Sequence, residues 1–516
     1  MDDAVNLLNE QGNLAQKQGH FQIAGKLFSQ ALKLDPDNSI LNFNLGNAFA
    51  RQQKYLAAIK WYRRAVALKP DYQKARVNLS SALSNLGRLK EALEINPHNT
   101  AARLRHIFYL KSICAWQELD RTLTPPLCDQ TPFFNIITDP NPAHNFQVAR
   151  NWSRSIQKET AGLSVKLPPR IKNNRITIGY VSDGFRDFPT GHKITGLLRH
   201  HNKQLFKIIL FSYGTDDHSI YRRLAQNYYD EFIDLQGVNS LQFAQTIANE
   251  RVDILVDLKG HTQHGKLDVF SLRPAPVQIA WLGFPGTTGA SFIDYIVTDK
   301  IVTPRHELKY YTERPIYMPH TYQIYDFGSK VPLKKKINKT FTFCSFNQSY
   351  KTEPPVFKVW MNILKRVPES RLWLWAEGHA PKNLRLQSLQ LGVNPSRILF
   401  AGKLPPDQHL ARLSRADLAL DTTPVNGHTT TLECLWAGVP VVTTLGTHFA
   451  SRVSASILTS AGLPQLITKN LKSYEDLAVN LATHPQKLPQ VSKSSALFDT
   501  KQFTLDLEQA YLSING

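Results

Sequence analysis

The chain has 516 residues, of which 42% are hydrophobic, and its 61 Lys and Arg residues outnumber 41 Asp and Glu residues. This length corresponds to about three domains of ordinary size. A charged fraction of 20% with 10% aromatic residues excludes a wholly disordered chain. No run of 18 apolar residues occurs and the first residues are polar, so neither a membrane span nor a secretory signal is expected. The net charge of +20 leaves nucleic acid, a membrane surface and an anionic small molecule open as partners.

The cysteines and the absence of standard cofactor motifs exclude further classes of protein. Cys114, Cys128, Cys344 and Cys434 are scattered and form no Cys-x-x-Cys pair, so neither a disulfide scaffold nor a structural zinc site is expected. A reducing cytoplasm is the expected location. The glycine-rich dinucleotide fingerprint, the Walker A motif and the His-Glu-x-x-His motif do not occur. This argues against a standard dehydrogenase, a P-loop ATPase and a zincin, and we expect neither a metal ion nor a cofactor.

A repeat with a period of 34 residues occupies the start of the chain. The positions that recur are Gly12 and Gly46, Ala24 and Ala58, Phe28 and Tyr62, Ala31 and Ala65, and Pro36 and Pro70. This pattern is typical of tetratricopeptide repeats, in which small residues stand where the two helices of a unit touch. A third unit begins at Gln73, carries Ser80 at the glycine position and reaches Pro97 about seven residues early. We therefore predict two and a half repeats over residues 1–99.

The rest of the chain divides into a helical connector at residues 100–165 and two α/β lobes at residues 166–332 and 333–516. In the lobes, short β-branched runs alternate with helix-length segments, which is typical of parallel sheets. The runs lie at residues 175–181, 206–214, 252–258, 277–283 and 292–299, then at 341–346, 371–376, 398–402, 418–422 and 440–444. The basic segment 328–340 separates the two lobes. Two such Rossmann-like lobes should face a cleft, with the ligand at the carboxyl ends of the strands.

The stretch from Asp421 to Glu433 is the first candidate site. A strand ends, Asn426-Gly427 makes a turn, and a helix begins with hydroxyl residues. The free N–H groups of a helix N-terminus, helped by the hydroxyls of Thr429 and Thr430 and by His428, can hold a phosphate. Alternatively, Thr430 and Glu433 form a capping box, although the polar run is longer than a cap requires.

The other candidates also follow strands. Lys351, at the end of the run 341–346, can pair with a pyrophosphate and stabilise the charge of a leaving nucleotide, and Gln348 can hydrogen-bond a base or sugar. The alternative for Lys351 is an exposed loop lysine. In the first lobe the turns 184–192, 257–262 and 281–289 contain Gly and Pro residues that let the backbone approach a ligand. Ordinary turn chemistry explains them too, and His192 and His261 are equally compatible with structural or surface roles.

These motifs together resemble one known family. They are NLGN at 44–47, LRPAPVQIAWLGFPGTTGASFIDYIVTD at 272–299, FNQSYK at 346–351 and NGHTTTLECLWAGVPVVT at 426–443. With them the chain resembles, over nearly its whole length, the tetratricopeptide-linked O-GlcNAc transferase and Spindly glycosyltransferases. The resemblance implies a tetratricopeptide α-solenoid followed by a GT-B fold of two Rossmann-like lobes. It also implies metal-independent, inverting transfer of a sugar from a sugar nucleotide to Ser or Thr of proteins.

The resemblance also implies roles for individual residues. Lys351 matches the lysine that binds the donor diphosphate, and Gln348 a neighbouring donor contact. His428, Thr429 and Thr430 match the residues that hold phosphate and ribose. Glu433 stands where the UDP-GlcNAc enzymes carry an Asp that binds the ribose, and its longer side chain is similar to the Spindly branch. The remaining substrate-binding positions are His409 and Arg412 near the base, Leu282, Gly286 and Thr287 at the sugar, and Pro189, Thr190, His261 and Thr262 in the turns of the first lobe.

One position departs from the family pattern. Phe188 stands before Pro189-Thr190, where the family carries a histidine that is important for activity. A phenyl ring can neither take a proton nor donate a hydrogen bond. Either His192 supplies a similar group, or no general base is needed there, or the enzyme is weak or inactive.

The leading hypothesis is a protein O-GlcNAc transferase with Lys351, His428 and His192 as catalytic residues. The repeats would recruit protein acceptors, with Asn44 and Asn78 gripping peptide backbone. His428 favours UDP-GlcNAc over GDP-fucose, since fucosyl relatives tend to lack it. The alternatives are a Spindly-type fucosyltransferase and a repeat scaffold that binds nucleotide without turnover. Nucleic acid is disfavoured because the basic residues, Lys334–Lys336 among them, are spread along the chain with no recognised motif, and no integral membrane association is expected.

Overall fold

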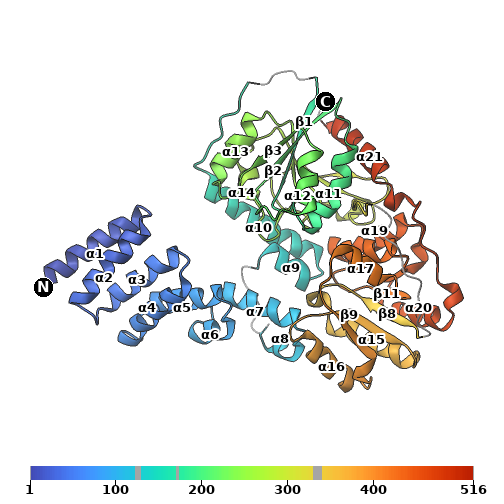
Figure 1. Cartoon of the computed structure of the whole chain (residues 1–516), viewed down its shortest axis with the longest axis horizontal. Helices are drawn as coiled ribbons and strands as arrows, with labels where there is room; N and C mark the ends of the chain where they lie inside the picture. The colour runs from blue at the N-terminus through green and yellow to red at the C-terminus, as the bar shows by residue number, and fades with distance from the viewer. Residues whose placement is uncertain (1, 123–129, 170–173, 329–339, 515–516) are drawn as a thin grey trace. The chain divides into compact units, whose positions relative to one another are not determined.

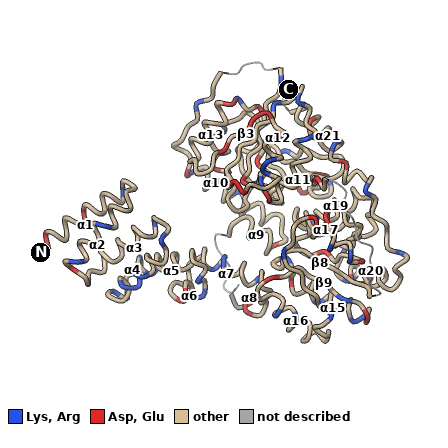
Figure 2. Tube along the Cα trace, viewed as in Figure 1, with Lys and Arg blue, Asp and Glu red and all other residues tan. Residues whose placement is uncertain are grey.

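The computed structural model describes residues 2–122, 130–169, 174–328 and 340–514. The chain forms two compact units, one of residues 1–111 with 115–129 and one of residues 112–114 with 130–516. Cys128, Lys334–Lys336 and the expected boundary between the lobes at residue 332 lie outside the described residues. Lys and Arg occur in the first unit and in both lobes of the second (Figure 2).

The first unit consists of helices, and each of the first six packs against its neighbours in the chain (Figure 1). They are α1 (Asp2–Lys17), α2 (Phe21–Leu34), α3 (Ser39–Arg51), α4 (Tyr55–Leu68), α5 (Gln73–Asn85), α6 (Leu89–Ile95), α7 (Thr100–Ser112) and α8 (Trp116–Thr122). A Cβ atom on Gly12 would lie 2.5 Å from the Phe28 ring, and one on Gly46 would lie 2.6 Å from the Tyr62 ring. Only glycine fits at these helix contacts, which explains why glycine recurs at this position of the repeat. Helix α6 has 7 residues where α2 and α4 have 14 each, consistent with the early proline.

The first lobe of the second unit is a parallel sheet with helices on its faces. Its strands are β1 (Ile176–Ser182), β2 (Phe206–Ser212), β3 (Glu231–Asp234), β4 (Ile254–Asp257), β5 (Val277–Ala280), β6 (Tyr295–Thr298) and β7 (Arg314–Tyr317), in the order β3-β2-β1-β4-β5-β6-β7. Its helices are α9 (Pro132–Thr138), α10 (Pro142–Thr160), α11 (Pro189–His200), α12 (Ile220–Asn227), α13 (Ser240–Asn249), α14 (Leu267–Ser271) and the 3-10 turn η1 (Arg305–Tyr310).

The second lobe repeats this plan. Its strands are β8 (Thr342–Ser345), β9 (Arg371–Trp375), β10 (Ile398–Ala401), β11 (Leu418–Leu420), β12 (Val441–Thr444) and β13 (Ile467–Thr468), in the order β10-β9-β8-β11-β12-β13. Its helices are α15 (Pro354–Arg366), α16 (Ala380–Gln390), α17 (Pro406–Leu413), α18 (Thr429–Trp436), α19 (Val453–Ser460), α20 (Leu471–Thr483) and α21 (Thr500–Ile514). The predicted fold class, a tetratricopeptide solenoid followed by two Rossmann-like lobes, is confirmed.

Helix α21 does not stay with the second lobe but packs on the first (Figure 1). Its Glu508 Oε1 lies 2.8 Å from Nδ1 of His201, at the end of α11, and the Tyr511 hydroxyl lies 3.4 Å from that of Tyr180 in β1. The lobes also meet at α19, where Ser456 Oγ donates to Asp299 Oδ2 at 2.7 Å. The chain thus crosses back at its end and ties the two lobes together. Among the described residues, no helix is long and apolar enough to cross a bilayer.

Candidate functional site

Two of the predicted motifs meet at the carboxyl ends of adjacent strands. β8 and β11 are neighbouring parallel strands, so the loops that follow them lie at the same edge of the sheet. Asn347 Nδ2 donates to Asp421 Oδ1 at 3.2 Å and to Thr422 Oγ1 at 3.0 Å, and Lys351 Nζ donates to the Asn426 carbonyl at 2.8 Å. The strand order alone therefore unites the Lys351 loop with the 421–433 loop in one site.

The loop after β11 is organised around the buried carboxylate of Asp421. The Gly427 N–H donates to Asp421 Oδ1 at 2.7 Å, and the Thr443 hydroxyl donates to Oδ2 at 2.6 Å. Burial raises the pKa of Asp421, while these hydrogen bonds favour its charged form. A Cβ atom on Gly427 would lie 2.5 Å from Thr431 Oγ1, so only glycine fits the turn. The backbone that enters α18 is therefore fixed in advance of any ligand.

The start of α18 excludes the alternative based on a capping box. The N-cap residue is His428, its side chain makes no capping hydrogen bond, and the helix begins at Thr429. Thr430 is therefore inside the helix. The Glu433 carboxylate instead lies 3.5 Å from the Tyr325 hydroxyl and 3.5 Å from His409 Nε2. The first turn of α18 consequently keeps backbone N–H groups that no capping side chain occupies, and the half-exposed Thr429 and Thr430 lie beside them.

Lys351 and His428 supply a cation and a neutral imidazole to this site. Burial lowers the pKa of Lys351 to about 8, and the charge of Asp421 opposes that shift. Burial, together with the charges of Lys351 and Lys193, holds the pKa of His428 well below its usual range. His428 is therefore neutral at pH 7. Its buried Nε2 has no hydrogen-bond partner among the described residues, which leaves it available to a ligand.

His409 and Arg412 pack against the ring of Phe346, two residues before Gln348 in the chain. The Arg412 guanidinium lies 4.8 Å from the centre of the Phe346 ring, and its Nη2 lies 2.6 Å from His409 Nδ1. Since Arg412 can only donate, His409 accepts at Nδ1 and carries its proton on Nε2, facing Glu433. The side chain of Gln348 is exposed. An aromatic ring with several donors is suited to a planar base and a sugar.

His192 lies on α11 at the junction of the lobes. Its Nε2 is 2.7 Å from Asp187 Oδ1, and its ring centre is 4.1 Å from that of Tyr221 and 6.5 Å from that of Tyr325. Because Tyr325 also reaches Glu433, this histidine is near the second lobe's site. The pair of a carboxylate and an imidazole resembles the arrangement that orients a general base.

Phe188 is the N-cap residue of α11, and Pro189 and Thr190 are its first two residues. The Phe188 ring centre lies 5.0 Å from Lys259 Nζ and 5.2 Å from the Arg186 guanidinium. The ring therefore serves as a neutral surface for two cations.

The remaining first-lobe candidates make hydrogen bonds within the protein. His261 Nε2 lies 2.7 Å from the Thr288 carbonyl, and burial lowers the pKa of His261 to about 4. The Thr262 hydroxyl donates to the Lys259 carbonyl at 2.8 Å. These contacts hold the turn after β4 and leave His261 neutral.

The 281–289 loop is held in the same way. The Thr287 hydroxyl donates to Glu313 Oε2 at 2.6 Å, and Glu313 also accepts from the Thr288 N–H at 2.6 Å. Leu282 has a φ of +74°, and a Cβ atom on Gly286 would lie 2.9 Å from Ile136 Cδ1. Packing and the Glu313 carboxylate therefore fix this loop. The Thr287 hydroxyl already donates its hydrogen to Glu313.

Sequence reasoning missed Lys193. This residue of α11 is 6% exposed, and its Nζ donates to Gln323 Oε1 at 2.9 Å. Burial lowers its pKa to about 7, Glu433 opposes that shift, and Lys351 adds to it. In the sequence, the one indication that Lys193 belongs with the candidate site is its position four residues after Pro189, which places both residues on one face of the helix. Within the described ranges no group of three or more His, Cys, Asp or Glu side chains could hold a metal ion.

Comparison with known proteins establishes the family. The model of glycosyl transferase family 41 matches residues 163–338 and 333–507, and a tetratricopeptide repeat model matches residues 9–73. The chain belongs to glycosyl transferase family 41. The resemblance to the O-GlcNAc transferase and Spindly group is thereby confirmed.

Individual relatives support this assignment. The chain is 34% identical over 72% of its length to a probable UDP-N-acetylglucosamine–peptide N-acetylglucosaminyltransferase, SEC, of Arabidopsis thaliana. It is 27% identical over 65% of its length to the UDP-N-acetylglucosamine–peptide N-acetylglucosaminyltransferase of Caenorhabditis elegans. The chain spans 40% of the length of each of these two relatives.

The fold also matches a solved structure of similar size. A lysine-to-methionine mutant of the Thermobaculum terrenum O-GlcNAc transferase superposes with a TM-score of 0.69 at 26% sequence identity. The match covers 100% of this chain and 98% of that one, so the repeat unit and both lobes are shared.

Proposed function

We propose that this chain transfers N-acetylglucosamine from UDP-GlcNAc to Ser or Thr hydroxyls of proteins, with inversion and without a metal ion. The observation that carries the proposal is the placement of Lys351 within 2.8 Å of the Asn426 carbonyl, in the turn that enters α18. An ammonium group, a neutral imidazole and a helix N-terminus together suit a diphosphate. The names of the plant and nematode relatives, both UDP-N-acetylglucosamine–peptide N-acetylglucosaminyltransferases, support UDP-GlcNAc as the donor.

The donor diphosphate would bind Lys351, His428 and the hydroxyls of Thr429 and Thr430. In the reaction, the acceptor oxygen forms a bond to the anomeric carbon of the sugar from the face opposite the diphosphate. The bond between that carbon and the diphosphate oxygen breaks, and its electron pair leaves with UDP. Lys351 and the α18 N-terminus stabilise the negative charge that grows on the leaving group.

The proton of the acceptor hydroxyl needs an acceptor of its own, and Phe188 cannot serve. We assign this role to His192, whose Nε2 is paired with Asp187 at 2.7 Å. The carboxylate would orient the imidazole and stabilise its protonated form once the hydroxyl proton has been taken. This geometry favours a turnover enzyme over a scaffold that only binds nucleotide.

The nucleoside would lie beside His409 and Glu433. The Glu433 carboxylate faces His409 and Tyr325 and can accept hydrogen bonds from ribose hydroxyls. Arg412 and Gln348 would contact the base. This assignment predicts that nucleotide without sugar binds the second lobe.

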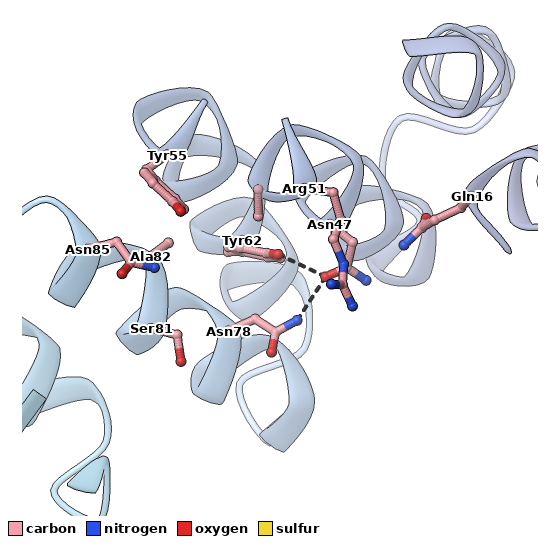
Figure 3. A pocket seen from close by; sticks show the side chains of 10 residues that line it. Gln16, Asn47, Arg51, Tyr55, Tyr62, Asn78, Ser81, Ala82 and Asn85 are labelled. Carbon is pink, nitrogen blue, oxygen red and sulfur yellow. Dashed lines mark hydrogen bonds between the residues drawn. The ribbon is translucent and has the colours of Figure 1, made fainter. Parts of the chain in front are cut away.

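Acceptor proteins would bind the repeat unit. A pocket of about 430 Å³ there is lined by polar side chains (Figure 3). Asn47 Oδ1 accepts hydrogen bonds from the Tyr62 hydroxyl and from Asn78 Nδ2, both at 2.8 Å. Asn44 Nδ2 donates to Asn9 Oδ1 at 3.0 Å. Asn44 Nδ2 gives its second N–H to Asn13 Oδ1 at 3.4 Å. Asn78 Nδ2 makes one hydrogen bond among the described residues, and its second N–H suits a carbonyl oxygen of an extended peptide.

The test is mass spectrometry of intact acceptor protein after incubation with a panel of UDP- and GDP-sugars. The expected result is one sugar mass per modified site with UDP-GlcNAc, and none when Lys351→Met replaces the native chain. Transfer from GDP-fucose alone would replace the donor assignment with the Spindly-type activity. Nucleotide binding without transfer or donor hydrolysis would support a binding scaffold instead.

A further inference from the structure

The ammonium group of Lys193 is held firmly inside the protein. Lys193 lies on α11 and is 6% exposed, and its Nζ donates to Gln323 Oε1 at 2.9 Å. Gln323 is itself buried, and its Nε2 donates to the Tyr322 hydroxyl at 2.6 Å, which turns Oε1 toward the lysine. The Tyr322 N–H in turn donates to Asp299 Oδ2 at 3.1 Å. This chain of hydrogen bonds fixes the position of the charge.

Lys193 lies near the junction of the two lobes, because its hydrogen-bond partner Gln323 is two residues before Tyr325, whose hydroxyl lies 3.5 Å from Glu433 of α18. Its ammonium senses the charges of Glu433 and Lys351, and together with Lys351 it lowers the pKa of His428. All three of these groups belong to the candidate site at the ends of β8 and β11. A lysine of the first lobe thus lies beside the donors of the second.

The charge of Lys193 is not balanced by a direct ion pair. Within the described part of the chain no carboxylate oxygen lies within 4.0 Å of its Nζ, and the same holds for Lys351. An ammonium group has three N–H donors, and each of these lysines uses one, on a neutral oxygen. Lys259, a buried lysine of the same lobe, contrasts with them because it pairs with Asp183 at 2.9 Å. One buried and one half-buried cation, both without an ion pair, are costly unless an anion joins them.

We propose that Lys193 is a second cationic contact for the diphosphate of the sugar-nucleotide donor, reaching it from the first lobe while Lys351 holds it from the second. The inference rests on the proposed function, because it assumes a nucleoside diphosphate at this site. It goes beyond that function by making the first lobe a part of the donor site. The charge that grows on the leaving nucleotide is then stabilised from both lobes.

The experiment compares nucleotide with nucleoside, because only the nucleotide carries the diphosphate. Isothermal titration calorimetry measures the Kd of UDP and of uridine for the full chain and its variants. Lys193→Gln keeps a hydrogen-bond donor for Gln323 but removes the charge. It should raise the Kd of UDP about tenfold or more, while the Kd of uridine should change less than about twofold. Lys193→Arg keeps the charge and should stay within about threefold of the native Kd for UDP.

A matched control removes another lysine of the first lobe, on a strand of its sheet rather than on α11. Lys207, near the start of β2, pairs with Glu231 at 2.9 Å, and Lys207→Met should leave the Kd of UDP unchanged. An unchanged Kd of UDP in Lys193→Gln overturns the inference. An equal loss of affinity for UDP and for uridine also overturns it, because such a loss would show that Lys193 has a structural role. If the native chain binds GDP instead, GDP and guanosine form the test pair. A native chain that binds neither nucleotide overturns the proposed function and this inference together.

Discussion

The two α/β lobes have the same parallel topology, but their strand-end side chains are used in opposite ways. In the second lobe, Lys351 touches only a backbone carbonyl, and the buried Nε2 of His428 has no partner among the described residues. In the first lobe, the comparable groups are bonded internally: His261 to the Thr288 carbonyl, and Thr287 to Glu313. The difference indicates that the second lobe keeps polar groups open to a ligand, whereas the turns after β4 and β5 of the first lobe are satisfied internally.

The largest expected effect comes from removing the central cation of the second lobe. Lys351→Met should lower the rate of sugar transfer by about 100- to 1000-fold, because one preorganised donor to the leaving group is lost. Thermal unfolding should change little, since Lys351 makes one hydrogen bond to the protein. Steady-state kinetics measure the effect, with Lys358→Met on the exposed face of α15 as the control. A decrease in transfer rate of less than about threefold would contradict the idea that the strand-end groups of the second lobe are free to act on a ligand.

The matching change in the first lobe should act on stability instead. Glu313→Ala leaves the Thr287 hydroxyl and the Thr288 N–H without their acceptor, and it should cost about 3 kcal/mol of unfolding free energy. Denaturant unfolding measures this cost, with Glu231→Ala on the edge strand β3 as the control. At a temperature where the variant is folded, its Kd for UDP should equal the native value. Weaker UDP binding in the folded variant would show that the first-lobe loop contacts the donor directly.

The pH dependence of UDP affinity should report the lysines at the junction of the lobes. Burial lowers the pKa of Lys193 to about 7 and that of Lys351 to about 8, and a bound diphosphate favours the protonated form of each. Affinity should therefore fall as pH rises from 7 to 9, by at most about tenfold per lysine for each pH unit. His428 is neutral throughout this range. Titration calorimetry at several pH values tests this, and a flat profile contradicts it.

The smallest effect concerns the buried histidine of the first lobe. Burial lowers the pKa of His261 from 6.5 to about 4, so the unfolded chain binds this proton more readily than the folded one. The stabilising contribution is therefore complete above pH 6.5 and is lost as pH falls toward 4. His261→Gln should reduce the acid-induced fall in Tm by about 3 °C. Equal falls in the native chain and the variant would mean that His261 does not titrate on unfolding.

Much of the fold could be predicted because interior strands are strongly patterned. The strands that sequence analysis missed are β3, β7 and β13, with 4, 4 and 2 residues, and each lies at an edge of its sheet. An edge strand is short and partly exposed, so its apolar pattern is weak. The strand-end motifs of the second lobe were found because their glycine, hydroxyl and basic residues are adjacent in sequence.

The parts of the site that could not be predicted depend on partners distant in sequence. Lys193 is a single lysine in a helix, and its acceptor, Gln323, is 130 residues away. Glu433 fits a capping box locally, but the helix begins at Thr429, and this carboxylate meets Tyr325, 108 residues away. Such pairings depend on how the lobes pack, which no local pattern specifies.

The return of α21 to the first lobe has a consequence for synthesis. His201 and Tyr180 are buried, and they find their polar partners in Glu508 and Tyr511. A ribosome makes α21 only after the strands of the second lobe, which precede it in the chain. The face of α11 that α21 covers therefore stays exposed while the second lobe is synthesised. Its final packing requires α21 and therefore occurs only after that helix has been made.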